Sequence, residues 1–83
     1  MKVQVRYFAS VREALGTAEQ VELPAGSTVA QLRELLIARS PQHAQALARE
    51  RAVRCALAQR MCAEDAVLVE GAEVAFFPPV TGG

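Results

Sequence analysis

Hydrophobic and polar residues alternate at the start of the chain, over residues 2–9. Val3, Val5 and Tyr7 fall on one side of an extended segment, and Phe8 falls on the other. Alternation with this period is typical of a β-strand with one buried face. The segment therefore predicts an opening strand whose inward side carries the two valines and the tyrosine.

Two short elements are predicted next. Residues 10–13, Ser-Val-Arg-Glu, form a capping-box pattern and predict a helix over residues 11–15 that ends at Gly16. Residues 19–23 alternate again and predict a second strand, followed by a Pro-Ala-Gly-Ser turn at residues 24–27.

The main helix is predicted over residues 28–40. Thr28 and Gln31 form a second capping box at its start. The apolar positions that follow recur at helical spacing and form one stripe, consisting of Val29, Leu32, Leu35 and Leu36. Pro41 is expected to end this helix.

Residues 42–63 are ambiguous. Their Ala, Arg, Gln and Glu content favours a helix, whereas Val53, Cys55 and Leu57 alternate as in a strand. Propensity alone predicts one long helix here. We interpret residues 53–59 as a third strand, on the basis of the resemblance described below.

The end of the chain combines a strand with an extended tail. Glu70-Gly71 predicts a turn, and residues 73–77 alternate as a closing strand. The two prolines that follow lack amide donors, so we expect the chain to leave the sheet there in an extended form. The predicted organisation is one domain over residues 1–77 and a tail over residues 78–83.

Length and charge restrict the possible functions. The 83 residues are 52% hydrophobic and carry no net charge. A chain near this size buries about 60–65% of its unfolded surface, enough for one core but not for a core plus a deep active site. An enzyme acting alone is therefore disfavoured. Because no overall positive field attracts phosphate backbones, we expect no nucleic-acid partner.

Cysteine usage and the lack of a long apolar run bear on location. Cys55 and Cys62 are too few for a disulfide scaffold, and no signal-peptide pattern precedes the first strand. The uncharged run over residues 74–83 holds two prolines and is shorter than the about 20 apolar residues that cross a bilayer. We expect a cytoplasmic chain with no membrane segment and no metal site.

Gly82 and Gly83 suggest covalent chemistry at the C-terminus. Lacking Cβ atoms, two glycines can pass through a narrow channel and leave the terminal carboxylate open. A carboxylate is a poor acyl donor, but an acyl-adenylate passes its acyl group to sulfur or nitrogen nucleophiles. A six-residue tail reaches at most about 20 Å, the depth of a pocket in another protein. The dipeptide alone favours a frayed end that has no function, whereas its position after a closing strand and two prolines favours a functional tail.

Residues 71–83, Gly-Ala-Glu-Val-Ala-Phe-Phe-Pro-Pro-Val-Thr-Gly-Gly, closely resemble the end of the MoaD-type small subunits of molybdopterin synthase, which are ubiquitin-like sulfur carriers. The resemblance extends more loosely over residues 3–9, 11–16, 28–29 and 53–59. It implies an α+β fold of the β-grasp (ubiquitin-like) type, in which a mixed sheet packs against one main helix.

The resemblance also implies a role for the tail. Gly83 would be adenylated from ATP by a ubiquitin-activating-like adenylyltransferase and then converted to a thiocarboxylate. The carrier would dock on the large subunit, in a heterotetramer of two small and two large subunits, and donate sulfur to cyclic pyranopterin monophosphate. It would supply the sulfur without being an enzyme on its own and without a permanently bound cofactor. The inserted tail would consist of Pro78, Pro79, Val80, Thr81, Gly82 and Gly83.

Three apolar residues on the outward side of the sheet are candidates for docking the large subunit and the activating enzyme. Alternation places Phe8 and Phe77 on this side, and Met61 follows the third strand. Ala56 and Ala58 are expected to share the same side. Exposed apolar patches are typical of binding surfaces, where aromatic and Met side chains are preferred anchors. The alternative is that strand twist or the first helix covers Phe8.

Other reactive residue types are interpreted as structural. Cys55 is expected to be a small buried hydrophobe, and Cys62, beside a turn and two acids, to be more exposed. His43 has no ligand or nucleophile partner at useful spacing and is expected on a solvated segment. The run of arginines over residues 49–60 is more typical of a solvated face than of a contact with a partner. Relatives often have Asn where this chain has Gln59.

Other functions stay open on the residues alone. A sulfur carrier of thiamine-type or cysteine-type synthesis would use the same tail chemistry, although the Phe-Phe-Pro-Pro approach over residues 76–79 argues against it. A protein modifier would be joined to lysines through Gly83. A passive ubiquitin-like interaction module would use neither sulfur loading nor attachment to lysines.

Overall fold

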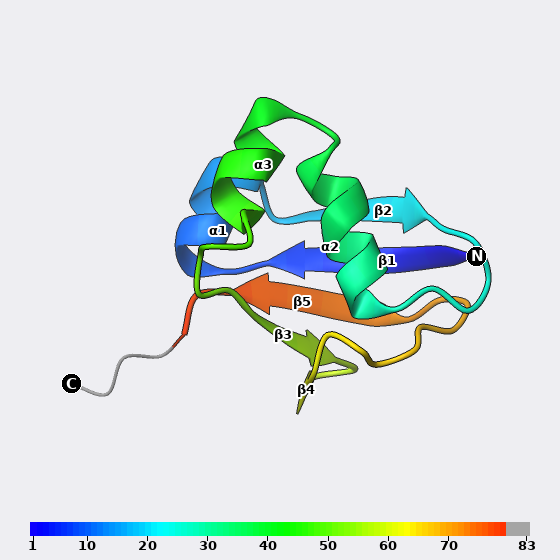
Figure 1. Cartoon of the computed structure of the whole chain (residues 1–83). Helices are drawn as coiled ribbons and strands as arrows, with labels where there is room; N and C mark the ends of the chain where they lie inside the picture. The colour runs from blue at the N-terminus through cyan, green and yellow to red at the C-terminus, as the bar shows by residue number, and fades with distance from the viewer. Residues whose placement is uncertain (80–83) are drawn as a thin grey trace.

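The computed structural model describes residues 1–79. The elements are β1 Lys2–Tyr7, α1 Ala9–Leu15, β2 Ala18–Glu22, α2 Val29–Ile37, α3 Pro41–Leu47, β3 Arg54–Leu57, β4 Arg60–Cys62 and β5 Glu73–Phe77. The strands form one five-stranded sheet in the order β2-β1-β5-β3-β4 (Figure 1). β1 and β5 run parallel, whereas the other neighbours run antiparallel, so the sheet is mixed.

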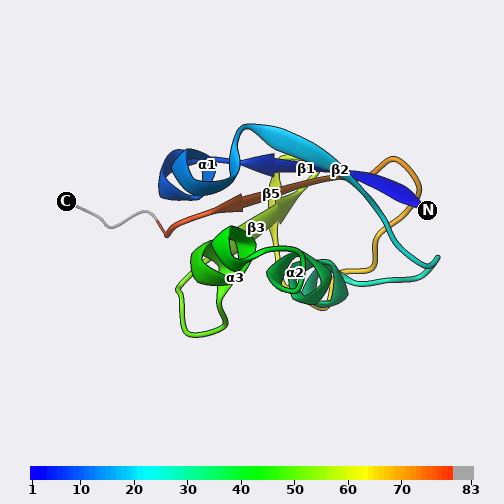
Figure 2. The same ribbon diagram turned by 90° about the horizontal axis from the view of Figure 1, so that it is seen from above.

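The core lies between one face of this sheet and the helices α2 and α3, which lie side by side on that face (Figure 2). The sheet contributes the inward side chains of the alternating strands, and α2 contributes its apolar stripe. The residues with at most 1% exposure in these elements are Val3, Val5, Tyr7, Val21, Val29, Leu32, Leu36, Leu47, Val74 and Phe76. This arrangement is the β-grasp fold that the resemblance implies, and the predicted inward faces of the first and last strands are confirmed.

The start of α2 is formed as predicted. The side-chain oxygen of Thr28 accepts a hydrogen bond from the backbone N–H of Gln31 at 3.3 Å, and the side-chain oxygen of Gln31 accepts one from the N–H of Thr28 at 2.8 Å. These two bonds satisfy amides that have no partner within the helix. The cap therefore fixes where the chain turns from the loop into the helix that covers the sheet.

The predicted capping box of α1 is wrong. The helix begins at Ala9, its N-cap is Phe8, and no side chain caps it. The reason is that the N–H of Phe8 donates to the carbonyl of Phe76 at 3.2 Å, which keeps Phe8 on the sheet and forces the turn into the helix onto Ala9. Ala9 has a φ of 54°, a conformation that non-glycine residues adopt only at a cost. Gly16 ends the helix as predicted.

The region after α2 holds a short helix, α3, where propensity alone predicted one long helix and where our interpretation had left the residues before the third strand open. α2 ends at Ile37, before the proline, but Pro41 then begins α3. Proline is favoured in the first turn of a helix because its missing N–H needs no partner there. Ser40 caps this helix by accepting a hydrogen bond from the N–H of His43 at 3.1 Å.

Residues 53–62 form a β-hairpin rather than one strand. The predicted third strand is confirmed over β3, but it ends at Leu57, and a second short strand, β4, follows a two-residue turn. Ala58 and Gln59 form this turn, with φ values of 51° and 66°. Two positive φ values in a two-residue loop match the twist of the paired strands. The prediction that the strand continues to Gln59 is therefore wrong.

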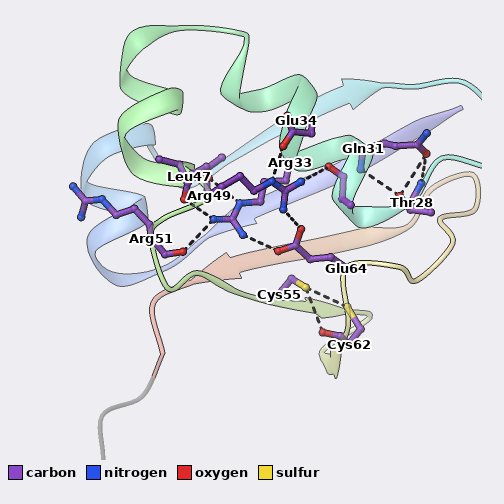
Figure 3. Close-up of polar contacts among 12 residues, drawn as sticks. Thr28, Gln31, Arg33, Glu34, Leu47, Arg49, Arg51, Cys55, Cys62 and Glu64 are labelled. Carbon is purple, nitrogen blue, oxygen red and sulfur yellow. Dashed lines mark hydrogen bonds and ion pairs between the residues drawn. The ribbon is translucent and has the colours of Figure 1, made fainter.

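A buried arginine organises the segment between α3 and β3 (Figure 3). Arg33, on α2, is 3% exposed. Its guanidinium donates to the carbonyls of Leu47 at 2.8 Å, Ala48 at 2.7 Å and Arg51 at 3.2 Å, and to the carboxylate of Glu64 at 2.7 Å. The end of α3 thereby finds donors for carbonyls that the helix itself leaves free. Sequence analysis had assigned no role to Arg33.

The arginines over residues 49–60 are exposed, as predicted. Arg49 is nevertheless tied to the fold, since its guanidinium bonds the carboxylates of Glu34 and Glu64. These two bonds raise the pKa of Arg49. A solvated face is therefore confirmed, but one of its members also crosslinks α2 to the loop that follows β4.

Candidate functional site

An apolar hollow lies on the face of the sheet that the helices leave open. Its volume is about 860 Å³, and Pro78 and Pro79 line it where the chain leaves β5. The other residues that line it are Arg6, Phe8, Ala9, Ala56, Gln59, Met61, Glu73, Ala75 and Phe77. The structure thus brings together Phe8, Met61 and Phe77, the three residues predicted to dock a partner.

Small residues at the middle of the sheet create this hollow. One row of paired residues crosses four strands on the outward face, from Met61 through Ala56 and Ala75 to Arg6. The two alanines lie at the middle of the row, on β3 and β5, and the large side chains lie at its ends. Because an alanine side chain is a single methyl group, the middle of the face is low and its margin is high.

Phe8 and Phe77 reach the margin because each continues the alternation of its strand. Tyr7 and Phe76, the residues before them, are paired across β1 and β5 and are buried. Phe8 is 41% exposed, and Phe77 is half-buried at the end of β5. The alternative that the first helix covers Phe8 is thereby excluded.

Met61 reaches the margin through the hairpin. It lies opposite Ala56 and is 56% exposed, one of the most exposed large hydrophobic residues of the described chain. Ala58, by contrast, lies in the turn and does not line the hollow. Its predicted place on the outward face is therefore wrong, because β3 ends before it.

Two charged residues border the apolar surface. Arg6 and Glu73 form an ion pair at 3.5 Å, and both side chains are substantially exposed. The guanidinium carbon of Arg6 also lies 5.9 Å from the centre of the Phe8 ring, within the range of a cation–π contact. The hollow therefore has an apolar floor and one charged edge, which is the arrangement of a binding patch with a polar rim.

The remaining tail residues cannot be placed against this hollow. Val80, Thr81, Gly82 and Gly83 lie outside the described residues, so their predicted insertion into a partner and the loading of Gly83 stay predictions. The described chain ends at Pro79, beside the hollow.

The prediction that His43 lies on a solvated segment is wrong. Its side chain is 13% exposed, and its Nε2 atom lies 2.7 Å from a carboxylate oxygen of Glu19. The hydroxyl of Tyr7 donates to the same oxygen at 2.6 Å, and Arg39 bonds the other at 2.6 Å. Burial would raise the pKa of Glu19, but the hydrogen bonds from Tyr7, His43 and Arg39 outweigh it and lower that pKa.

Tyr7 shows the opposite effect in the same cluster. Burial, followed by the hydrogen bond to Glu19 and its negative charge, raises the pKa of Tyr7. The phenol therefore stays protonated and serves as a donor. The cluster joins β1, β2 and the start of α3 on the helix side of the sheet, away from the hollow, and its role is structural.

The predicted burial of the two cysteines is confirmed. Cys55 is 5% exposed and belongs to the core, and Cys62 is more exposed than Cys55. Residues 1–79 contain no group of three or more His, Cys, Asp or Glu side chains arranged to hold a metal ion. Among the same residues, no helix has the length and apolar character needed to span a membrane.

Comparison with known proteins places the chain. The family model described as the ThiS family matches residues 5–83, almost the entire length. The chain belongs to the ThiS family. This ThiS-family chain is 43% identical over 82 residues to the molybdopterin synthase sulfur carrier subunit of Escherichia coli (strain K12), a match that covers 98% of this chain and 99% of the relative.

The ThiS-family chain is also similar to solved structures. A putative molybdopterin converting factor, subunit 1, from Pyrococcus furiosus has a TM-score of 0.81 and 32% identity, over 96% of this chain and 99% of that chain. A chain from the protein–protein complex of subunits 1 and 2 of molybdopterin-converting factor from Helicobacter pylori 26695 has a TM-score of 0.69 and 22% identity, over 100% of both chains. This second likeness shows the shared fold.

Proposed function

We propose that this chain is the sulfur carrier and small subunit of a molybdopterin synthase. The observation that carries the proposal is the contiguity of the apolar hollow with Pro78 and Pro79, since a docking surface beside the root of the tail lets one partner hold the domain and receive its end. The 43% identity to the carrier subunit from Escherichia coli supports the same conclusion.

The chemistry takes place at the terminal carboxylate of Gly83. The carboxylate attacks the α-phosphate of ATP on a ubiquitin-activating-like adenylyltransferase, and pyrophosphate leaves. Hydrosulfide, supplied by a sulfur donor, then attacks the acyl carbon of the adenylate and AMP leaves, which results in a thiocarboxylate. Acyl-adenylate and thiocarboxylate are covalent states of the chain, so no permanently bound cofactor is required.

The folded domain serves to position this group. Phe8, Met61 and Phe77 supply apolar area that a partner can cover, and the Arg6–Glu73 pair supplies a polar rim. The two prolines fix φ and resist folding back, so the tail is directed outward into the large subunit. There the sulfur passes to cyclic pyranopterin monophosphate, and the catalytic groups for that step belong to the large subunit.

Intact mass spectrometry tests the proposal. The chain is coexpressed with a ubiquitin-activating-like adenylyltransferase and a sulfurtransferase that supplies sulfur. We expect a mass increase that corresponds to the exchange of one oxygen for sulfur, located at Gly83 by fragmentation. The matched control is the chain without Gly83, which retains the folded domain and should gain no sulfur.

Two results would contradict the proposal. Lysine-linked adducts of the chain, without sulfur exchange, would favour a protein modifier. Sulfur exchange followed by transfer to a thiazole or cysteine precursor, and not to the pyranopterin in the presence of the large subunit, would favour a carrier of another pathway.

A further inference from the structure

Two thiols meet on the helix side of the β3–β4 hairpin (Figure 3). Cys55 and Cys62 are directly paired across the two strands, and their Sγ atoms lie 3.6 Å apart. The thiol of Cys55 also donates to the carbonyl of Cys62 at 3.4 Å. The contact belongs to neither the hollow nor the tail, because alternation places Ala56 and Met61 on the other face of the same hairpin.

The backbone geometry permits a covalent bond between them. Directly opposed residues of antiparallel strands have Cα atoms about 4.5–5.5 Å apart, within the about 4.4–6.8 Å that disulfides span. The sulfur atoms must approach from 3.6 Å to the disulfide length of about 2.05 Å. β4 is an edge strand of three residues that pairs only with β3, so a small shift of this strand can close the distance.

The two thiols differ in access. Both thiols line an open hollow of about 500 Å³, together with residues such as Arg54 and Glu64, but Cys62 is the more exposed of the two. Cys55 is 5% exposed, and burial, followed by its contact with Cys62, raises its pKa to about 12. An external oxidant therefore reaches Cys62 first, and Cys55 lies at contact distance from it as a protonated thiol.

We propose that Cys55 and Cys62 form a redox-active dithiol that closes to an intramolecular disulfide when a peroxide oxidises it. The sulfur of Cys62 attacks one oxygen of the peroxide and the O–O bond breaks. Cys62 becomes a sulfenic acid, and water leaves. The sulfur of Cys55 then displaces the sulfenic hydroxyl, the S–S bond forms, and a second water leaves. Two thiols and one peroxide thus give one disulfide and two waters, and a dithiol reductant reverses the reaction.

Mass spectrometry of the reduced full chain treated with hydrogen peroxide tests this inference. We expect a monomeric protein that has lost two hydrogen atoms and that is not alkylated at Cys55 or Cys62. Treatment with dithiothreitol should restore both hydrogen atoms and both alkylation sites. In Cys55→Ala, Cys62 should instead stop at the sulfenic acid, detected by trapping with dimedone. In Cys62→Ala, Cys55 should react at least about tenfold more slowly than Cys62 does in Cys55→Ala, because it is buried.

Several outcomes would overturn the inference. These are oxygen addition at Cys62 without loss of hydrogen in the unmodified chain, disulfides only between two chains, and equal oxidation rates in the two variants. Circular dichroism confirms that each variant is folded, and Cys55→Ser replaces Cys55→Ala if the alanine variant is not. Tail loading at Gly83 is measured separately, so failure of the disulfide and failure of the sulfur-carrier function give different results.

Discussion

Placing a charge at Met61 tests whether the hollow is the docking surface. Full burial of a methionine side chain contributes about 1.5–3 kcal/mol. Met61 is 56% exposed, so covering this exposed part on docking contributes about 1–1.5 kcal/mol. In Met61→Arg this contribution is lost, and a guanidinium must be desolvated against an apolar floor, which costs at least about 1 kcal/mol more. We expect a total loss of about 2–3 kcal/mol in binding free energy, which corresponds to a dissociation constant about 30–150-fold larger.

The assay is isothermal titration of the chain into the purified large subunit of a molybdopterin synthase. The matched control is Val69→Arg, because Val69 is an exposed apolar residue, 67% exposed, that does not line the hollow. This variant should bind like the unmodified chain. Urea unfolding of both variants should give unchanged stability, since both side chains lie at the surface.

Two results would refute the reasoning. Unchanged affinity of Met61→Arg would show that the partner does not cover the hollow. An equal loss in Val69→Arg would show that charge anywhere on the surface, and not the apolar contact, governs binding.

Three further predictions concern the fold that carries this surface. Arg33→Met removes the donor of three backbone carbonyls and should lower the free energy of unfolding in urea by about 3–5 kcal/mol. Replacement of the exposed Arg54 in Arg54→Met should change it by less than about 0.5 kcal/mol. A small loss in Arg33→Met would contradict the assigned role. Gln59→Gly relieves a φ of 66° and should stabilise the domain by about 1 kcal/mol, so that calorimetry finds a melting temperature about 4–8 °C higher, and a decrease would exclude strain at this turn. Burial raises the pKa of Glu19, but its hydrogen bonds lower that pKa further, to below its ordinary 4.5. The carboxylate therefore stabilises the fold above pH 4.5, and this contribution is lost as the pH falls through the folded-state pKa. Glu19→Gln should be less stable than the unmodified chain at neutral pH by a margin that shrinks as the pH falls below 4.5, and a constant margin would contradict the linkage.

Local pattern was sufficient to predict the elements whose signals lie within a few residues. Alternation predicted β1 and β5, and the Thr28 capping box predicted the start of α2. The hairpin turn was not predictable in the same way, because Ala58-Gln59 lacks the Asn-Gly type of sequence that marks such turns. There the pairing of β3 with β4 imposes positive φ values that the residues themselves disfavour.

The contacts of His43 and Arg33 could not be predicted, for a different reason. His43 meets Glu19 across 24 positions of sequence, and Arg33 meets Glu64 across 31. No periodicity connects such partners, because their proximity follows from how α2 and α3 pack on the sheet. The same holds for the two cysteines, whose contact depends on the register of the unpredicted strand β4.

The hollow itself shows what sequence analysis undervalues. Phe8 and Phe77 could be placed from alternation, since both continue strands whose inward residues are evident. The depth between them depends on Ala56 and Ala75, which register alone brings side by side at the middle of the sheet. In a chain with 16 alanines, such residues carry little information when counted. At these two positions, however, the absence of a larger side chain is what leaves the hollow open, so the proposed docking surface depends on its two small residues as much as on Phe8 and Phe77.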